Sequence, residues 1–490
     1  MKNISIIFSF ILILGFVSCG DDYFEVNVPS NAVEEDDLRM SDLLGPVIHS
    51  TILGQYSVEQ SFGNYAQYFV SDGGGAAGLT SASGLWSEVY LFVLPNINSI
   101  KAKAAASNAI YYDGVADVLT AINIGIATDT WDNIPYTSAS GGVENLSPTF
   151  DEQQAIYDEI LSLLDSAIAS FGQADASGLT PGNEDLIYRG DIDKWERAAY
   201  TLKARYLLRL MTKGVASPSE VLSAVNNGFT SNSDDFQMDF DERNLNPWYT
   251  VEVVAKSTGN FHHDIAEQLV SSMNGDYFPF DGSLDIDPRL PVFADNGGDA
   301  EWKGYVSGGE GLASDGTEAN ADFAGNSFYT SPNSPLVLIT FAEAMFIKAE
   351  AEFWAAGGST TSTGSSSAAY DAYINGIMAS MEKFGVDGSD YLDDDAISMG
   401  SDDLRLEHIM KEKYIHNFLN PESFSDFRRY DFSDNVFRGL ELRANSEDED
   451  PEFAGQWFRR ADYPSSERNR NPSVVSANEE SVVVPVWWDE

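Results

Sequence analysis

The side chains that most often carry enzyme chemistry are few and poorly spaced in this chain. It holds one cysteine and five histidines, and it contains no G-x-S-x-G elbow, Walker lysine loop or H-E-x-x-H zinc motif. His262 and His263 are adjacent, and His408 and His416 are two helical turns apart, so ordinary core or surface histidines explain both pairs better than a metal site. The glycine run at 73–78 fits G-x-G-x-x-G, but it follows a helix-like segment and opens no helix. These patterns predict a protein that is not an enzyme and has no cofactor or catalytic metal.

Carboxylates are abundant, with 77 Asp and Glu residues. A glycosidase needs two carboxylates at a set separation, and no pair stands out here, so a surface glycoside hydrolase stays an alternative. The stretches "DGSLDIDPR" (281–289) and "DGSDYLDDD" (387–395) do not meet EF-hand spacing. We expect both to be solvated turns, and a structural calcium ligand within them stays open.

Aromatic side chains in polar, glycine-rich stretches are the strongest sign of a ligand site. Flat rings pack against the apolar faces of sugars, while Asp, Asn and Gln take the hydroxyl groups. Each ring alone is explained by packing under a loop, but the set favours sugar recognition. The rings concerned are Trp86, Trp131, Trp248, Tyr249, Tyr277, Phe278, Trp302, Tyr305 and Tyr329.

The formal net charge is −49, from 28 basic and 77 acidic residues. A surface this acidic repels phosphate backbones, which excludes nucleic-acid binding and disfavours contact with anionic lipid headgroups. Solubility explains most of this charge.

The first residues have the pattern of an export signal. Lys2 precedes an apolar run at 4–17 that is too short to span a bilayer. The single cysteine, Cys19, follows directly in "GFVSCGDDYFE" (15–25), which is similar to a lipoprotein cleavage site. A chance cysteine after an ordinary signal is the alternative, but the chain has no second cysteine for a disulfide. We expect a signal peptide at 1–18 and a lipid anchor on Cys19, so that the protein is tethered to a membrane without spanning it.

Helical periodicity dominates the rest of the chain. The helix over 193–211 places Trp195, Ala199, Leu202, Tyr206 and Leu210 on one face, and Asp193 with Glu196 resembles a capping box. Thr149 with Glu152 is expected to cap the helix that ends before Gly172, and Pro335 to open a deeply buried helix that ends at Gly357. Further helices are predicted over 36–55, 86–106, 110–128, 216–228, 261–273, 367–384 and 402–419.

This order of elements predicts a mainly α fold in which helix pairs pack side by side, as in tetratricopeptide repeats, although no clean 34-residue repeat occurs. The scaffold covers about 36–228 and 335–419, and a loop-rich region covers about 230–334. Loops this long inside a compact protein are usually functional. The part from 420 to 490 reads as irregular, with a strand-like "SVVVPVWW" near its end. Residues 19–490 are predicted to form a single domain.

Several stretches together resemble the SusD/RagB family of nutrient-binding outer-membrane lipoproteins. They span essentially the whole chain, and none is diagnostic alone. They are "SCGDDYFE", "LWSEVYLFVLPNINSI", "DTWDNIPYTSA", "KWERAAYTLKARYLLRL", "LITFAEAMFIKAEAEF", "LEHIMKEKYIHNFLNPESFSDFRRYDF" and "FRRADYPSSERNRN".

The resemblance implies four tetratricopeptide-like helix pairs and a loop-rich part that carries the ligand site. It also implies a partner, a TonB-dependent SusC-type barrel, to which the lipoprotein delivers an oligosaccharide, or a peptide as in the RagB branch. Asp21 and Asp22 after Cys19 look like the signal for the outer face of the outer membrane. By position, the resemblance suggests a ligand site built from Asp72, Trp86, Tyr277, Trp302 and Tyr329.

Overall fold

A computed structural model describes residues 37–139, 145–444 and 451–490 of the protein. The predicted signal segment, Cys19 and the two acids after it lie outside the described residues. None of the described helices combines the length and hydropathy that a membrane-spanning helix needs.

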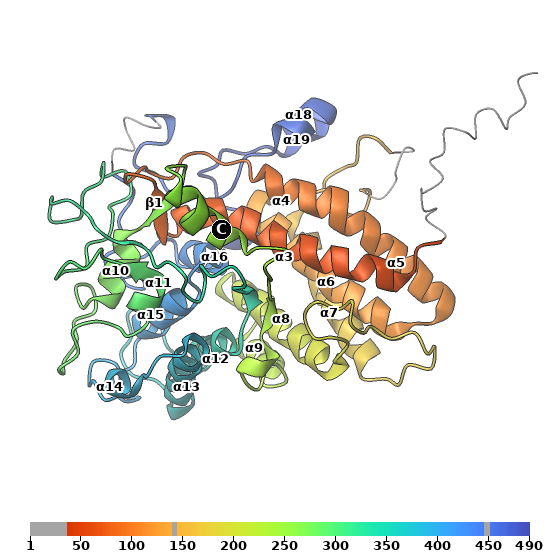
Figure 1. The fold of residues 1–490 in the computed structure, drawn as a ribbon. Helices are drawn as coiled ribbons and strands as arrows, with labels where there is room; N and C mark the ends of the chain where they lie inside the picture. The colour runs from red at the N-terminus through yellow and green to blue at the C-terminus, as the bar shows by residue number, and fades with distance from the viewer. Residues whose placement is uncertain (1–36, 140–144, 445–450) are drawn as a thin grey trace, which may run out of the picture.

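The N-terminal half is a stack of helices, each packed against its neighbours in the chain. A π-helical segment, Glu88–Val93, joins α4 to α5, so the helix predicted over 86–106 is three consecutive pieces. In Figure 1 these helices, red to yellow, fill one end of the molecule. They are α3 (Met40–Tyr65), α4 (Ser83–Ser87), α5 (Leu94–Ser107), α6 (Ile110–Trp131), α7 (Gln153–Phe171), α8 (Ile192–Thr212) and α9 (Pro218–Val225).

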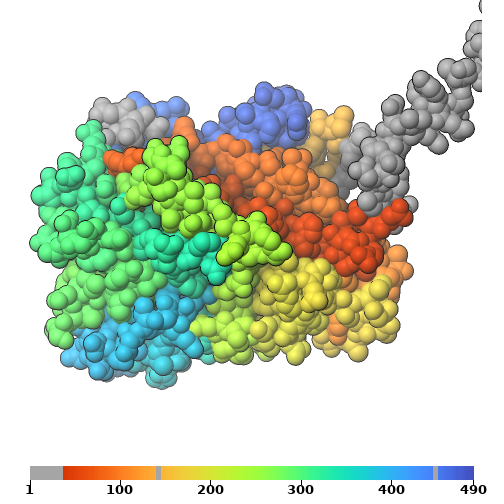
Figure 2. Space-filling view, viewed as in Figure 1, coloured from red at the N-terminus to blue at the C-terminus, as the bar shows by residue number. Residues whose placement is uncertain are grey.

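The middle of the chain, in green and teal, gathers at the opposite end in both views (Figures 1 and 2). It holds short helices and a second π-helical segment, Tyr249–Ala255. A small antiparallel sheet has the order β1-β3-β5-β4, and β2 pairs separately with β6. The elements are β1 (Phe69–Ser71), β2 (Phe236–Met238), β3 (His263–Ile265), α10 (Glu267–Met273), α11 (Leu290–Phe293), β4 (Ala294–Asp295), β5 (Asp322–Phe323) and β6 (Leu336–Ile339).

The C-terminal third returns to helices that pack on the first stack through α8 and α9. The last residues fold back onto α6 and α7, where Trp488 donates from its indole to Asp129 (2.8 Å) and from its backbone to Gln153 (3.0 Å). The helices are α12 (Phe341–Ala355), α13 (Ser367–Phe384), α14 (Ser389–Leu392), α15 (Leu406–His416), α16 (Glu422–Arg429), α18 (Ser465–Arg470) and α19 (Pro472–Asn478), and short 3-10 turns lie at Asn232–Asp234, Pro451–Phe453 and Trp487–Asp489.

The mainly helical fold and the buried helix faces that periodicity predicts are confirmed. The five side chains of the predicted stripe on α8 are all buried, and so are Phe346, Ile347 and Phe353 of α12. Burial of an amphipathic face provides most of a helix's stability in a protein. One large cluster of buried apolar side chains runs from Met40 to Trp488 and joins the helical stack to the middle region.

Several predicted boundaries are wrong. Asp191, not Asp193, caps α8, because its carboxylate accepts from the backbone of Lys194 (3.2 Å). The residue before α7 is Glu152, whose side chain makes no capping bond, so the proposed Thr149 cap is not formed.

Short strands also interrupt predicted helices. Residues 263–265 form β3 and 336–339 form β6, where helices over 261–273 and from Pro335 were expected. The segment before the glycine run contains β1, not a helix. The tail "SVVVPVWW" forms turns and no strand, and α16 orders part of the region expected to be irregular.

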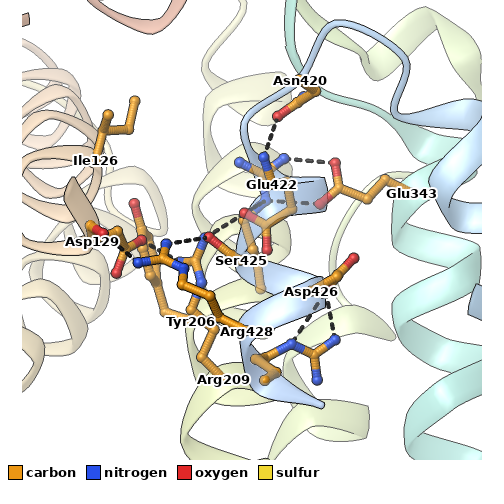
Figure 3. A network of polar contacts seen from close by, with 12 residues as sticks. Ile126, Asp129, Tyr206, Arg209, Glu343, Asn420, Glu422, Ser425, Asp426 and Arg428 are labelled. Carbon is orange, nitrogen blue, oxygen red and sulfur yellow. Dashed lines mark hydrogen bonds and ion pairs between the residues drawn. The ribbon is translucent and has the colours of Figure 1, made fainter. Parts of the chain in front are cut away.

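A network of buried ion pairs locks α6, α8, α12 and α16 together (Figure 3). Arg205 on α8 binds Glu343 on α12 through two hydrogen bonds (2.6 and 2.8 Å). Arg209, one turn later, binds Asp129 on α6 (3.0 Å) and also Glu422 on α16. Removing one partner of a buried pair costs about 3–5 kcal/mol, because it leaves the other charge uncompensated.

The polar residues of the family-like stretch over 420–432 lie in the same core. Arg428 donates to the Asp129 carbonyl (2.8 Å), and Arg429 binds Glu350 (2.7 Å) and Asp426 (2.6 Å). These residues therefore hold the scaffold together.

Candidate functional site

Two of the predicted ligand residues, Tyr277 and Trp302, line the same cavity of about 570 Å³. Cavities of this volume are typical of small-molecule sites. We call it the acidic cavity, because its charged lining residues are five carboxylates and one lysine: Glu267, Asp276, Asp285, Glu301, Asp315 and Lys303.

Asn274, at the end of α10, links the segments that carry the two aromatic residues. Its side-chain amide donates to the carboxylate of Asp276 (2.8 Å) and to the carbonyl of Trp302 (3.4 Å). The backbone of Tyr277 in turn donates to the carbonyl of Ser271 inside α10 (2.9 Å). The helix end thus holds the backbone of both residues near the same short element.

The strand-like segment that carries Trp302 runs close beside the start of α10. The backbone of Glu267 donates to the carbonyl of Tyr305 (2.9 Å), and Ala266 and Tyr305 form a parallel bridge. A Cβ atom at Gly304 would lie only 2.5 Å from Cα of Glu267, so only glycine permits this approach. Gly304 is therefore part of what places Trp302 over the cavity.

The carboxylates of the cavity differ in how they are held. Glu267 accepts from the hydroxyls of Ser314 (2.6 Å) and Ser271 (2.9 Å), and burial raises its pKa. Hydrogen bonds from Thr317 and Lys303 lower the pKa of Asp315 to about 2. The phenol of Tyr277 stays protonated, because burial raises its pKa to about 12. Near neutral pH the cavity combines ionised acceptors at Asp315 with a phenol donor at Tyr277.

This arrangement can bind a polyhydroxylated ligand. Trp302 and Tyr277 are half-buried aromatic residues, and Asp276 and Glu301 are exposed around them. Sugar rings present apolar C–H faces to aromatic rings and donate hydroxyl hydrogens to carboxylates.

Trp86 and Tyr329 do not belong to this site. Trp86 is 8% exposed and packs edge-on against Trp131, with the ring centroids 5.1 Å apart. Tyr329 is 6% exposed and packs among Phe293, Phe384 and Phe418. The expectation that these two rings face a ligand is corrected, because both rings are parts of the core.

Asp72 is exposed but lies outside the acidic cavity, after the end of β1. Its carboxylate is 3.7 Å from Nε2 of His262, which is 3.6 Å from the carboxylate of Asp264. Ligand atoms of His262, Asp264 and Asp322 lie within 4.8 Å of one another, so these three could hold a cation. Lys256 already provides a positive charge 2.5 Å from Asp322, and a cation would compete with it.

The two aspartate-rich stretches contact each other, and each buries one aspartate, while their other aspartates are exposed as expected of solvated turns. Asp394 is 1% exposed and accepts from the backbone N–H groups of Asp281 (3.0 Å), Gly282 (2.7 Å) and Ala396 (2.9 Å). Asp287 is fully buried and binds Arg289 (2.6 Å). The protein's own donors therefore occupy both carboxylates.

The sequence missed Glu267, Asn274, Lys303 and Asp315 as cavity residues. Lys303 is next to Trp302, so adjacency to a predicted ring was a usable signal. Glu267 had none, because its place depends on how the segment around Tyr305 pairs with the start of α10.

Comparisons with known proteins agree with this architecture. The SusD-like family model, described as "starch-binding associating with outer membrane", matches residues 31–472. The comparison with curated protein sequences gives no match.

Among solved structures, a chitin-binding SusD homologue from Flavobacterium johnsoniae has a TM-score of 0.70 and 20% identity, over 92% of this chain and 98% of its own. A SusD/RagB family protein from Bacteroides thetaiotaomicron has a TM-score of 0.68 and 23% identity, over 92% and 99%. Another structure, a chitin-binding protein, has a TM-score of 0.69 and 22% identity, over 92% and 100%. These likenesses show the fold, and because the family model covers most of the sequence, the chain belongs to the SusD-like family.

Proposed function

We propose that the protein binds an oligosaccharide at the cell surface without cleaving it and delivers it to a SusC-type TonB-dependent barrel in the outer membrane. The observation that carries the proposal is the acidic cavity, where Trp302 and Tyr277 lie among carboxylate acceptors. The family description as starch-binding and the chitin-binding structural neighbours support a carbohydrate ligand.

Surface attachment is the second part of the proposal. We assign a lipid to Cys19 and place the folded part on the extracellular face of the outer membrane. The apolar run 4–17 followed by Cys19, Asp21 and Asp22 supports this location, as does the outer-membrane association in the family description. Two or more acyl chains anchor a protein stably, whereas one chain binds only weakly.

A peptide is the second candidate ligand, and the charge of the cavity favours it. Five carboxylates against one lysine would attract a lysine or arginine side chain. The membrane partner and the surface location would be the same for both ligands.

Hydrolysis is the third candidate, and the raised pKa of Glu267 is the observation that keeps it open. A glycosidase acid needs such a shift, with a second carboxylate across the scissile bond.

Calorimetry on residues 20–490 would test the proposal with malto-oligosaccharides, chito-oligosaccharides and lysine-containing peptides. We expect saturable binding of one oligosaccharide, and a loss of at least about 2 kcal/mol, or about thirtyfold in affinity, in Trp302→Ala. Trp354→Ala is the matched control, since Trp354 is a half-buried tryptophan on α12 outside the cavity.

Each other outcome separates the candidates. Binding of peptides alone would replace the sugar by a peptide. Release of new reducing ends that stops in Glu267→Gln would make the protein a hydrolase.

A further inference from the structure

A second cavity, of about 370 Å³, begins where the first one ends along the chain. Tyr277 lines the acidic cavity, and the next two residues, Phe278 and Pro279, line the second. We call it the basic cavity, because its polar lining consists mainly of hydrogen-bond donors: Thr363, Arg405, His408, Lys411 and Arg438. The chain has 28 lysines and arginines among 490 residues, so three in one cavity are a local concentration.

The two arginines share one carboxylate. Arg405 and Arg438 each place a guanidinium nitrogen 2.6 Å from the same oxygen of Glu407. Arg438 also donates to the Tyr277 carbonyl (3.0 Å), and its guanidinium lies 4.6 Å from the centre of the Phe278 ring. A guanidinium has five N–H donors, and Arg405, whose side chain is 43% exposed, keeps most of its donors for a ligand.

Lys411 adds a positive charge at the inner end. Its ammonium donates to the hydroxyl of Tyr391 (2.6 Å) and is 2.9 Å from Glu412, which also binds Arg289. The charged groups form two separate clusters. One joins Arg405 and Arg438 to Glu407, and the other joins Lys411 and Arg289 to Glu412, with Asp287 bound to Arg289. The first cluster has one positive charge in excess and the second is balanced, while the exposed Asp403 in the lining and the exposed Asp434 in the adjoining cavity are further carboxylates.

His408 is neutral and contributes one more donor. Its Nδ1 accepts from the backbone N–H of Arg405 (3.2 Å), which places the proton of the neutral ring on Nε2. Burial and the three surrounding cations lower its pKa to about 3. A negatively charged ligand group would offset the influence of these cations on the pKa of His408.

A neighbouring cavity of about 300 Å³ extends the basic cavity with hydroxyl groups. The two share Thr363, Arg405 and Arg438. The extension is also lined by Thr360, Thr361, Ser362 and Asn435, and by the carboxylates of Glu407 and Asp434. Hydroxyl groups both donate and accept, as the hydroxyls of a sugar require.

We infer that the basic cavity and its hydroxyl-lined extension bind the carboxylate of an acidic saccharide, a uronate, with Arg405 as the exposed contact. The planar carboxylate matches a guanidinium fork, and the threonine and serine hydroxyls meet the rest of the sugar. The inference rests on the proposed function and adds a second, anion-selective site to it. A peptide with a free C-terminus presents the same carboxylate but none of the sugar hydroxyls.

Calorimetry with trigalacturonate and its methyl ester tests the inference, because the ester keeps the sugar and removes the charge. We expect the wild type to bind the acid at least about tenfold more tightly than the ester, as charge-assisted hydrogen bonds are worth about twice neutral ones. Arg405→Gln should weaken acid binding about tenfold and leave ester binding unchanged. In NMR, the ring signals of His408 should move with the acid and not with the ester.

Two variants serve as controls. Arg243→Gln removes the same charge from a side chain that is 91% exposed elsewhere, and it should leave both affinities unchanged. Thr363→Ala probes the cavity without changing a charge, and it keeps the test decisive if Arg405→Gln fails to fold.

Three results would overturn the inference: equal binding of acid and ester, equal weakening of both ligands in Arg405→Gln, or binding of a free-acid peptide without binding of trigalacturonate. If trigalacturonate does not bind, the inference fails even when a neutral oligosaccharide still binds and depends on Trp302. If no oligosaccharide binding depends on Trp302, the proposed function fails first.

Discussion

The acidic cavity, lined by Tyr277, and the basic cavity, lined by Phe278, have charged lining residues of mainly opposite sign. The acidic cavity presents carboxylates and two aromatic residues, and its single lysine is bound to Asp315 (2.9 Å). The basic cavity presents guanidinium, ammonium and imidazole donors around a phenylalanine. The charged groups of the first are mainly acceptors, and those of the second are mainly donors.

The difference teaches how a chain of net charge −49 keeps a site for a negatively charged group. Long-range repulsion from the surface disfavours an anion everywhere. Guanidinium donors directed at one point, with apolar walls such as Phe278 and Ile397 that strengthen each contact, offset it. The same overall charge does not weaken the binding of a neutral sugar in the acidic cavity.

The largest expected effect on ligand binding separates the two cavities by their aromatic contacts. Trp302→Ala should weaken a neutral oligosaccharide by about 2 kcal/mol or more, because a buried aromatic contact carries much of a small interface. Arg405→Gln should not change that affinity. Calorimetry on both variants checks the contrast, and a loss in both would mean that one ligand covers both cavities.

The second effect is on the free energy of unfolding, whose pH dependence differs between a titratable group of the basic cavity and one of the acidic cavity. Since the folded pKa of His408 is about 3 against an ordinary 6.5, the unfolded chain takes up a proton first as the pH falls. The contribution of His408 is present above pH 6.5 and is lost between pH 6.5 and 3, by about 1.4 kcal/mol for each pH unit. Melting temperatures between pH 4 and 8 should show a smaller acid loss in His408→Gln. An unchanged slope would contradict a neutral, buried ring.

Glu267 gives the acidic cavity the opposite dependence. Burial raises its folded pKa above 4.5, so its contribution to stability is present at low pH and is lost as the pH rises through the folded value. Ligand binding needs the ionised acceptor and should weaken by about 1 kcal/mol as the pH falls through that value. Calorimetry at several pH values should show this trend in the wild type and not in Glu267→Gln. The same trend in both proteins would assign it to another group.

The smallest effect concerns coupling between the cavities. If they bind separate ligands, Trp302→Ala should change the affinity for trigalacturonate by less than about 0.5 kcal/mol, and its effect should add to that of Arg405→Gln. The double variant, compared with both single variants, measures this. A larger coupling energy would join the two cavities into one extended site.

Prediction from the sequence succeeded where a signal is local and repeated. The helices α6, α7 and α8 appear close to their expected ranges, because apolar residues at three- and four-residue steps mark a buried face. It failed for β3, β5 and β6, which are two to four residues long. Strands so short show too few alternating positions to be recognised, and their pairing partners are distant in the chain.

The five predicted ligand residues do not all come together in the structure. Tyr277 and Trp302 share a cavity as a ligand site requires, whereas Trp86 and Tyr329, from equally polar and glycine-rich surroundings, entered the core. Local composition does not distinguish an aromatic ring that is buried beneath a loop from one that is exposed on the loop surface. That choice depends on which helices pack behind the loop.

Composition and periodicity alone determined that this chain is acidic, mainly helical and rich in aromatic residues in its loops. Each of these properties depends only on residue counts or on residues that are close together in the sequence. Only the tertiary structure decided which charges meet. Phe278, Thr363, Arg405 and Arg438 are scattered over the chain, and the packing of α15 against α10 and α13 brings their segments to one cavity. Electrostatic interactions depend on distance in space, and distance along a sequence does not report it.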